Sequence, residues 1–388
     1  MDTILSRMSR VYRILRNVHG VYVLPLFAGY IFANIRILVA IAMWLDTIFF
    51  GAAMKAKKAD RPIILVGNPR TGTTFLQRFL AAEGFGSGME LFLMLYPSLL
   101  LQKILTPFMP LLEIISPAKY HSTEAHHTSL TSVETDDVGV LFRHFDGFFL
   151  YGFFLSFDEE DMVPAVDPKV RDTSARDFDW LEQLWLRSLV VHDEDRNIAK
   201  LFSLAPRLPQ FMKRFPNAQI LYTVRDPVAV VPSSMSLVIG VLDRAFGFWT
   251  LPEDVRQQWL DRMYAAWLML FQRFHDDWTN GSINHDDVFI VRYDRMMADF
   301  DGMMEEMCEF LGHEMTPELR ATIKEKADKQ RAYKSKHKYD LAKFGLSEEK
   351  IRTDFAFVYE TFLPPMDFSK GDDAAGDDAA GDDAKASA

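Results

Sequence analysis

The sequence predicts an α/β fold in which a parallel sheet carries helices on both faces. Three short apolar runs rich in β-branched residues read as buried strands, at residues 63–66, 220–224 and 288–291. A turn and then a helical pattern follow each of them. Strands that alternate with helices form a parallel sheet, because each crossover helix returns the chain to the same sheet edge.

Each predicted helix has a recognisable start. After the first strand, a glycine-containing turn leads into a helix over 73–84, ending at a glycine. After the second, Arg-Asp-Pro leads into a helix over 228–238, which Pro232 is expected to bend or restart. After the third, Arg-Tyr-Asp-Arg-Met leads into a helix around 297–311.

The first 60 residues differ in composition from the rest and are expected to form a separate segment. Arginines recur there every three positions, so a helix would carry them as one basic stripe. An apolar stretch follows over residues 18–50, but it lacks the roughly 20 uninterrupted apolar residues of a membrane-spanning helix. The arginines are Arg7, Arg10, Arg13 and Arg16, and the interruptions are Pro25, Asn34, Arg36 and Asp46.

Basic residues on both sides of the apolar stretch favour a segment that dips into or lies on an anionic membrane face. Lys55, Lys57 and Lys58 close it. Two alternatives stay open: a helical hairpin packed on the core, and a single tilted span. A further apolar and mostly helical insertion at 92–115 is expected to be a lid, a pocket wall, a second membrane contact or ordinary core helices.

Almost half of the formal net charge of −11 comes from the last 18 residues. Residues 371–388 hold six Asp and one Lys, so they carry −5 and the other 370 residues carry −6. We expect residues 369–388 to be a disordered acidic tail. A mildly acidic body can still hold one positive cleft, but it gives no reason to expect a nucleic-acid partner. The single cysteine, Cys308, favours a reducing compartment.

The strongest local signal is the octapeptide Gly-Asn-Pro-Arg-Thr-Gly-Thr-Thr at 67–74, between a predicted strand and a predicted helix. Such a turn aims backbone N–H groups and the positive end of the helix dipole at an anion. It resembles the phosphate loop of nucleotide triphosphatases, so the sheet is expected to be P-loop-like, but Thr73 replaces the lysine. The loop offers Arg70 instead.

A second motif ends the second strand. Arg225-Asp-Pro stands there, with Ser233 eight residues after the arginine. Together the two motifs resemble the sulfotransferases that use 3′-phosphoadenosine 5′-phosphosulfate (PAPS), particularly the bacterial-type branch related to tyrosylprotein sulfotransferases. The resemblance extends over roughly residues 61–362, and we expect a sulfotransferase domain over 61–368.

The resemblance implies transfer of a sulfuryl group from PAPS to a hydroxyl or amine of an acceptor, with no metal ion. The loop would bind the 5′-phosphosulfate and stabilise the charge that grows on the leaving group. Arginine and serine of the second motif would bind the 3′-phosphate. The implied PAPS-binding residues are Arg70, Thr71, Gly72, Thr73, Thr74, Arg225 and Ser233.

The general base is expected among acidic residues. Relatives use a Glu where Glu90 stands, just after the first helix, and Glu134 and Asp137 are the next candidates. Bracing of loops is the alternative role for each carboxylate. His126 and His127 also precede this acidic patch, and a basic cluster, Lys334, Lys336, His337 and Lys338, resembles a loop that closes over the nucleotide.

Two other classes of function stay open: a membrane-associated, non-catalytic scaffold on the same fold, and a P-loop kinase. The motifs at Arg70 and Arg225 argue against the first, and the missing lysine argues against the second. Relatives tend to follow Lys200 with Ser-Pro or Asn-Pro, so its role stays open. The apolar segments suggest a lipid-like acceptor and a membrane-associated protein with a cytoplasmic catalytic domain.

Overall fold

The computed structural model describes residues 3–116, 129–332 and 340–366. Its centre is a four-stranded parallel sheet in the order β2-β1-β3-β4. The three strands expected from the sequence are present, and a fourth, β2, was not expected. The strands are β1 (Ile63–Gly67), β2 (Ile198–Leu201), β3 (Gln219–Val224) and β4 (Val288–Arg292).

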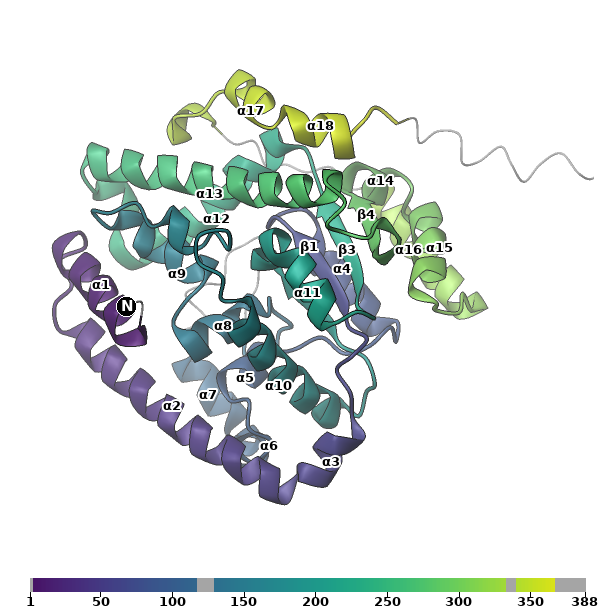
Figure 1. Ribbon diagram of the computed structural model, residues 1–388, viewed down its shortest axis with the longest axis horizontal. Helices are drawn as coiled ribbons and strands as arrows, with labels where there is room; N and C mark the ends of the chain where they lie inside the picture. Colours follow the sequence, from purple (N-terminus) through teal and green to yellow (C-terminus); the bar gives the residue numbers. More distant parts are fainter. Residues whose placement is uncertain (1–2, 117–128, 333–339, 367–388) are drawn as a thin grey trace, which may run out of the picture.

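Helices cover both faces of the sheet, as predicted (Figure 1). Because side chains alternate along a strand, Ile63 and Leu65 enter one core, and Ile64 and Val66 enter the other. The first core contains α4 (Thr73–Ala82), α14 (Tyr293–Ala298), α15 (Phe300–Leu311) and α16 (Pro317–Ala332). The second contains α10 (Ser174–His192), α11 (Leu208–Arg214), α12 (Pro227–Phe246), α13 (Glu253–Thr279), α17 (Glu348–Asp354) and α18 (Ala356–Phe362).

Two helix boundaries differ from the prediction. Helix α12 continues through Pro232 without a restart, because the apolar residues around it are buried in the core and hold the helix in place. The helix expected around 297–311 is divided into α14 and α15. Asp299 lies at the break, and its side chain accepts a hydrogen bond from Gly302 N at 3.1 Å, which caps α15.

The insertion between β1 and β2 is helical, as the sequence indicated. Its helices after the first α/β unit are α5 (Leu91–Leu95), α6 (Leu99–Leu105), α7 (Met109–Ile115), α8 (Asp137–His144) and α9 (Phe148–Phe153). They lead into α10, which packs against the second core. Part of the insertion therefore consists of ordinary core helices, while α6 and α7 keep exposed apolar side chains.

The N-terminal segment forms a helical hairpin packed on the domain, with α1 (Ile4–Asn17), α2 (Leu24–Phe49) and a short α3 (Gly51–Ala56). Val11, Ile14 and Leu15 of α1 are buried in the second core. Part of the arginine stripe makes hydrogen bonds and ion pairs within the protein. Arg7 is buried, its Nε donating to Phe145 O at 2.7 Å, and Arg10 pairs with Asp158 at 3.2 Å. The stripe is therefore not a free basic surface.

Helix α2 is continuous over 26 residues, although its sequence suggested an interrupted apolar stretch. Pro25 lies in the first turn, where a proline removes no helical hydrogen bond. Arg36 and Asp46 do not interrupt the helix because both point toward the domain and find partners there. In the part of the chain that the structure describes, α2 and α12 are the helices long and apolar enough to cross a membrane, and the apolar window of α12 is 44% buried, against 11% for α2.

Candidate active site

The loop from β1 to α4 is held in one conformation by its backbone and its hydroxyl groups. Gly67 and Gly72 have φ values of 137° and 90°, and Arg70 has 72°, all in a region that favours glycine. The Thr71 hydroxyl donates to Asn68 O at 2.7 Å and lies 2.6 Å from the Thr223 hydroxyl of β3. The loop therefore presents the N-terminus of α4 at the carboxyl edge of the sheet.

The structure brings the two predicted motifs together. Since β1 and β3 are neighbouring parallel strands, the segments that follow them meet. Arg70 Nε donates to Ser233 Oγ at 3.1 Å, and Arg225 Nη1 donates to Arg70 O at 3.0 Å. The Arg225 guanidinium also lies 4.0 Å from the ring centroid of Tyr293, which limits its orientation.

This cluster has the properties of an anion site. Among the described residues, neither Arg70 nor Arg225 has a carboxylate within ion-pair distance. The buried side-chain amide nitrogen of Asn68, in the same loop, also has no hydrogen-bond partner among them. Two uncompensated guanidinium groups and an unused donor at a helix N-terminus fit a ligand with several phosphate or sulfate oxygens.

Lys200 joins the site from the strand that the sequence did not reveal. Its side chain is almost fully buried, and Nζ donates to Thr74 Oγ1 at 3.2 Å, at the start of α4. Burial lowers the pKa of Lys200, and the negative charge of Glu134 partly opposes that shift. The structure thus places a cation beside the loop that lacks the usual P-loop lysine, from a different strand.

The acidic patch surrounds the backbone of Lys200. Asp136 is fully buried and accepts hydrogen bonds from Trp185 Nε1 and Lys200 N, both at 2.9 Å. Burial raises its pKa to about 7, against these two hydrogen bonds. Asp137 accepts from Phe202 N at 2.7 Å. Asp136 and Asp137 therefore brace β2 and the turn that follows it.

The two candidate bases lie in different surroundings. Glu134 is buried, accepts from Ser132 Oγ at 3.0 Å and contributes its charge beside Lys200. Glu90 is about one quarter exposed, and its Oε2 lies 3.1 Å from Nε2 of His192, at the end of α10. This hydrogen bond raises the pKa of His192. Glu134 therefore lies on the side of Lys200 and the loop, and Glu90 contacts α10.

Several predicted residues lie outside the described part of the chain. These are His126 and His127, the basic cluster at 334–338 and the acidic tail. Of the residues that the structure places, Lys200 and His192 are the ones that sequence reasoning left without a role. A lysine between apolar residues in a short buried run was the available signal for Lys200. Nothing in the sequence joins His192 to Glu90, which lies 102 positions earlier.

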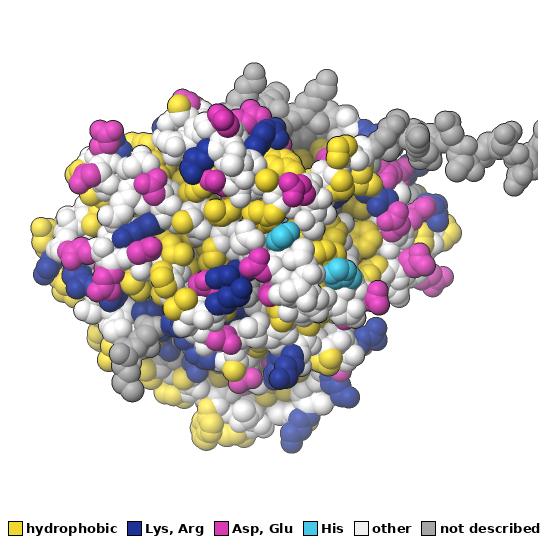
Figure 2. Space-filling view, turned by 45° about the horizontal axis from the view of Figure 1, so that its top comes forward, with side chains coloured by type: hydrophobic (Ala, Val, Ile, Leu, Met, Phe, Trp, Pro, Cys, Tyr) yellow, Lys and Arg dark blue, Asp and Glu magenta, His cyan; other side chains and the backbone are white. Residues whose placement is uncertain are grey.

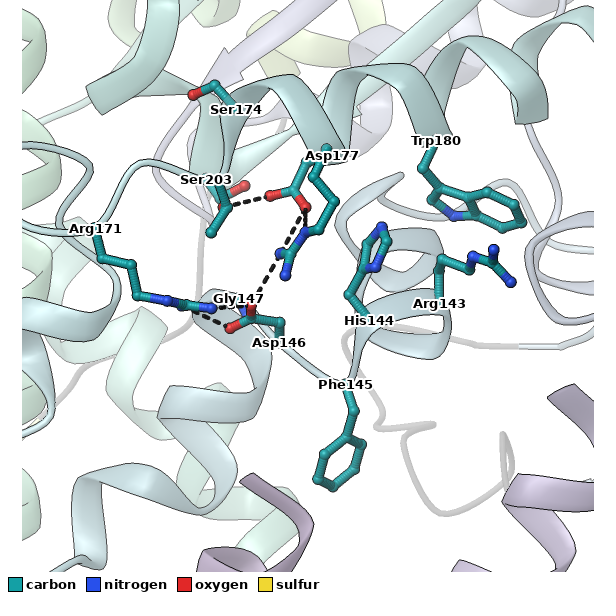
Figure 3. Close-up of polar contacts among 12 residues, drawn as sticks. Arg143, His144, Phe145, Asp146, Gly147, Arg171, Ser174, Asp177, Trp180 and Ser203 are labelled. Carbon is teal, nitrogen blue, oxygen red and sulfur yellow. Dashed lines mark hydrogen bonds and ion pairs between the residues drawn. The ribbon is translucent and has the colours of Figure 1, made fainter. Parts of the chain in front are cut away.

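A second polar pocket lies next to this site, between α8, α10 and the 3-10 helix η5 (Phe202–Arg207) (Figure 3). Asp146 pairs there with Arg171 at 2.5 Å, and Asp177 pairs with Arg207 at 2.7 Å. Burial alone would raise the pKa of Asp146, but the surrounding arginines lower it to about 2. Because these carboxylates are already matched by cations, we assign the cluster a structural role.

The chain is similar in sequence and in fold to known proteins. A model of the sulfotransferase family matches residues 62–317, more than half of the chain. The chain belongs to the sulfotransferase family. The match confirms the family resemblance carried by the two motifs.

Named relatives of this sulfotransferase come from mycobacteria. It is 23% identical over 298 residues to the omega-hydroxy-beta-dihydromenaquinone-9 sulfotransferase Stf3 of Mycobacterium bovis and of Mycobacterium tuberculosis, covering 74% of this chain and 73% of the relative. The crystal structure of sulfotransferase STF1 from Mycobacterium tuberculosis has a TM-score of 0.65 at 17% identity, covering 91% of both chains. STF9 from Mycobacterium avium has a TM-score of 0.58 at 17% identity, covering 82% of this chain and 81% of that one. These two structures share the fold of the sulfotransferase described here.

Proposed function

We propose that this sulfotransferase moves a sulfuryl group from PAPS to a hydroxyl group of an apolar, lipid-like acceptor. The observation that carries the proposal is the meeting of Arg70, Arg225 and Ser233 at the N-terminus of α4, with two guanidinium groups that lack carboxylate partners among the described residues. Lys200 adds a third cation at Thr74.

The residues divide between the two ends of PAPS. Arg225 and Ser233 bind the 3′-phosphate, because both lie on the β3–α12 side of the cluster and can donate to its oxygens. The loop residues Thr71 to Thr74 bind the 5′-phosphosulfate through backbone N–H groups and hydroxyls. The hydrogen bond from Arg225 to Arg70 O holds the two subsites in a fixed relation.

The reaction is an in-line displacement at sulfur. The acceptor oxygen forms a bond to sulfur, and the bond from sulfur to the bridging oxygen breaks, so adenosine 3′,5′-bisphosphate leaves with that electron pair. Negative charge therefore grows on the bridging oxygen, where Arg70 and Lys200 stabilise it. The acceptor hydroxyl transfers its proton to a carboxylate.

Glu90 is the proposed base. Its carboxylate is partly exposed, so an acceptor can reach it, and its Oε2 lies 3.1 Å from Nε2 of His192. Glu134 is the alternative. It is buried beside Lys200, and its charge supports that of the lysine, so we assign it a positioning role.

An apolar groove supports a lipid-like acceptor. It runs between α2 and α5, with Ile35 and Val39 on one side and Met94 and Leu95 on the other. Helix α5 begins directly after Glu90. The mycobacterial relative is an omega-hydroxy-beta-dihydromenaquinone-9 sulfotransferase by name, and we propose an acceptor of a similar kind for this chain. We propose a membrane-associated protein with a cytoplasmic catalytic domain, and the single buried Cys308 agrees with a reducing compartment.

The experiment is titration calorimetry with adenosine 3′,5′-bisphosphate in metal-free buffer, comparing wild type with Arg70→Ala and Arg225→Ala. Tight binding by wild type that both variants lose supports the site. A folded wild-type protein that does not bind would overturn the enzyme assignment and favour a scaffold, and binding of ATP only with magnesium would favour a kinase. A panel of sulfated products then tests the acceptor: sulfation of water-soluble sugars or peptides alone would exclude a lipid-like one.

A further inference from the structure

The exposed large apolar side chains are concentrated on one surface. Of those that the structure records as exposed, most lie on the outer side of α2, on the turn before it, and on α6 to α7. We call this surface the apolar face. Its members are Tyr22, Val23, Leu24, Leu26, Phe27, Tyr30, Ile31, Ile37, Leu38, Ile41, Trp44, Ile48, Phe49, Ile104, Phe108, Leu111 and Ile114. Soluble proteins rarely leave an apolar surface of this extent without a partner.

Helix α2 is apolar on both sides: Val39 and Ala42 pack against the domain, and large apolar side chains also cover its outer side. Tyr30, Ile37 and Ile48 lie on one side of a 3.6-residue period and are 68%, 61% and 59% exposed. Arg36 and Asp46 lie on the opposite side and contact the domain. The outer side of an ordinary surface helix is polar, so the apolar outer side of α2 indicates an apolar environment outside it.

Asp46 fixes this orientation. Its carboxylate is completely buried, pairs with Arg187 Nε at 3.1 Å and accepts from Leu99 N and Leu100 N, each at 3.0 Å. Those N–H groups begin α6, so one carboxylate holds α2, α6 and α10 together. At 1.5 Å per residue, α2 is about 39 Å long, which is enough to cross a bilayer. To do so, however, it would have to break the contacts of Asp46. Helix α2 therefore lies along the domain, as Figure 1 shows at its lower left edge.

The charge around the apolar face is positive. Residues 1–60 contain eight Lys or Arg and three Asp, within a chain whose net charge is −11. Arg16, Lys55, Lys58 and Lys103 are exposed at or near the ends of α1, α3 and α6, whereas Arg13 is exposed but pairs with Asp158 at 3.7 Å. By contrast, the face seen in Figure 2 mixes acidic, basic and apolar side chains. A basic rim complements anionic lipid headgroups, whereas a second copy of this chain would bring two basic rims together.

We propose that the apolar face docks in the plane of an anionic bilayer, with α2 lying in the interface and not crossing it. Tyr22, Tyr30 and Trp44 then lie at the headgroup level, where amphipathic rings are favoured. The groove between α2 and α5 lies behind the docked helix. In this placement an apolar acceptor can pass from the lipid along α2 toward Glu90 without crossing water. The role of Glu90 in this step rests on the proposed function.

The first test is sedimentation of the full chain with vesicles of phosphatidylcholine alone or mixed with phosphatidylglycerol. Wild type is expected to bind the mixed vesicles, and Ile37→Glu/Ile41→Glu/Ile48→Glu is expected to lose affinity by about tenfold or more. The control is Val170→Glu, because Val170 is an exposed apolar residue that does not belong to the apolar face. It should bind like wild type. Equal binding by the triple variant, or no binding by wild type, would overturn the proposal.

Two further readouts separate the alternatives. Single cysteines at positions 30, 37 and 48 can carry a depth-sensitive fluorophore, because the native Cys308 is buried. An in-plane helix gives equal, shallow quenching at all three, while a spanning helix gives the deepest signal at 37 and refutes the orientation. A wild-type dimer in size exclusion that the triple variant abolishes would assign the face to a second copy instead.

The proposed function can fail separately. Titration of the triple variant with adenosine 3′,5′-bisphosphate reports the PAPS site, which the substitutions do not touch. Unchanged nucleotide binding with lost vesicle binding supports docking on its own. Vesicle binding by a wild type that does not bind the nucleotide would keep the docking proposal and reject the enzymatic one.

Discussion

Replacement of Lys200 by methionine tests whether the loop takes its third cation from β2. Methionine has a similar length and removes the charge. In the structure, Nζ contacts Thr74 Oγ1 at 3.2 Å, and Thr74 lies in the first turn of α4, where the phosphosulfate is proposed to bind. The substitution therefore removes a positive charge beside the leaving group and leaves the loop backbone intact.

The magnitude follows from the geometry. Two unit charges about 4 Å apart interact by about 4 kcal/mol at an effective dielectric constant of about 20. Removal of one donor to the developing charge typically costs about 2.7–4 kcal/mol, or about 10²–10³ in kcat. We expect a loss of kcat in that range, with a smaller loss in affinity for adenosine 3′,5′-bisphosphate, because charge on the bridging oxygen grows in the transition state.

A loss of stability in Lys200→Met has to be separated from a loss of catalysis, because Glu134 and Asp136 lose a neighbouring cation in this variant. Asp146→Asn removes a buried charge from the separate cluster, and it should lose stability while retaining kcat. Kinetics are measured on both variants after circular dichroism shows that each is folded. A Lys200→Met enzyme within about threefold of wild type, or an equal loss of kcat in Asp146→Asn, would refute a role of Lys200 in the transition state.

Three other predictions follow from contacts of single carboxylates. Glu90→Gln is expected to lower kcat by about 10²-fold or more, while Glu134→Gln should lower it less and mainly weaken nucleotide binding. Equal losses in the two single-turnover rates would contradict this division of roles. Asp46→Ala should lower the free energy of unfolding by about 3–5 kcal/mol in urea denaturation, because the Arg187 charge stays buried without its partner. Asp46→Asn, which retains hydrogen-bonding capacity, should lose less. The Asp146 carboxyl, with its pKa lowered to about 2, should contribute about 2 kcal/mol of stability above its unfolded pKa near 3.9, and this is lost as the pH falls through about 2. Acid unfolding of Asp146→Asn should lack that component, and an identical pH dependence would argue against it.

The parts of the fold that local sequence determines could be predicted. The three apolar strands and the loop at 67–74 are local patterns, and the two halves of the anion site could be expected to meet because parallel strands end at one sheet edge. Strand β2 could not be found in this way. A lysine in a four-residue strand is buried here because the acidic patch and Thr74, both distant in sequence, surround it.

The prediction for the N-terminal segment also lacked tertiary information. In a hydropathy pattern, Arg36 and Asp46 interrupt the apolar stretch, because such a pattern contains no information on which side of the helix faces the protein. The structure provides partners for both on the domain, so α2 stays one helix. The pairing of Glu90 with His192 is likewise a tertiary contact without a local pattern.

The buried contact between Asp46 and Arg187 has a consequence for the evolution of a soluble relative. A detachable anchor could be lost in one deletion and leave a working enzyme in solution. Here the same deletion would strip Val11, Ile14 and Leu15 from the core and leave a guanidinium group in an apolar interior. If the apolar face docks on a membrane as proposed, a descendant that works in solution would have to keep the hairpin and exchange the outer side chains of α2 one by one for polar ones.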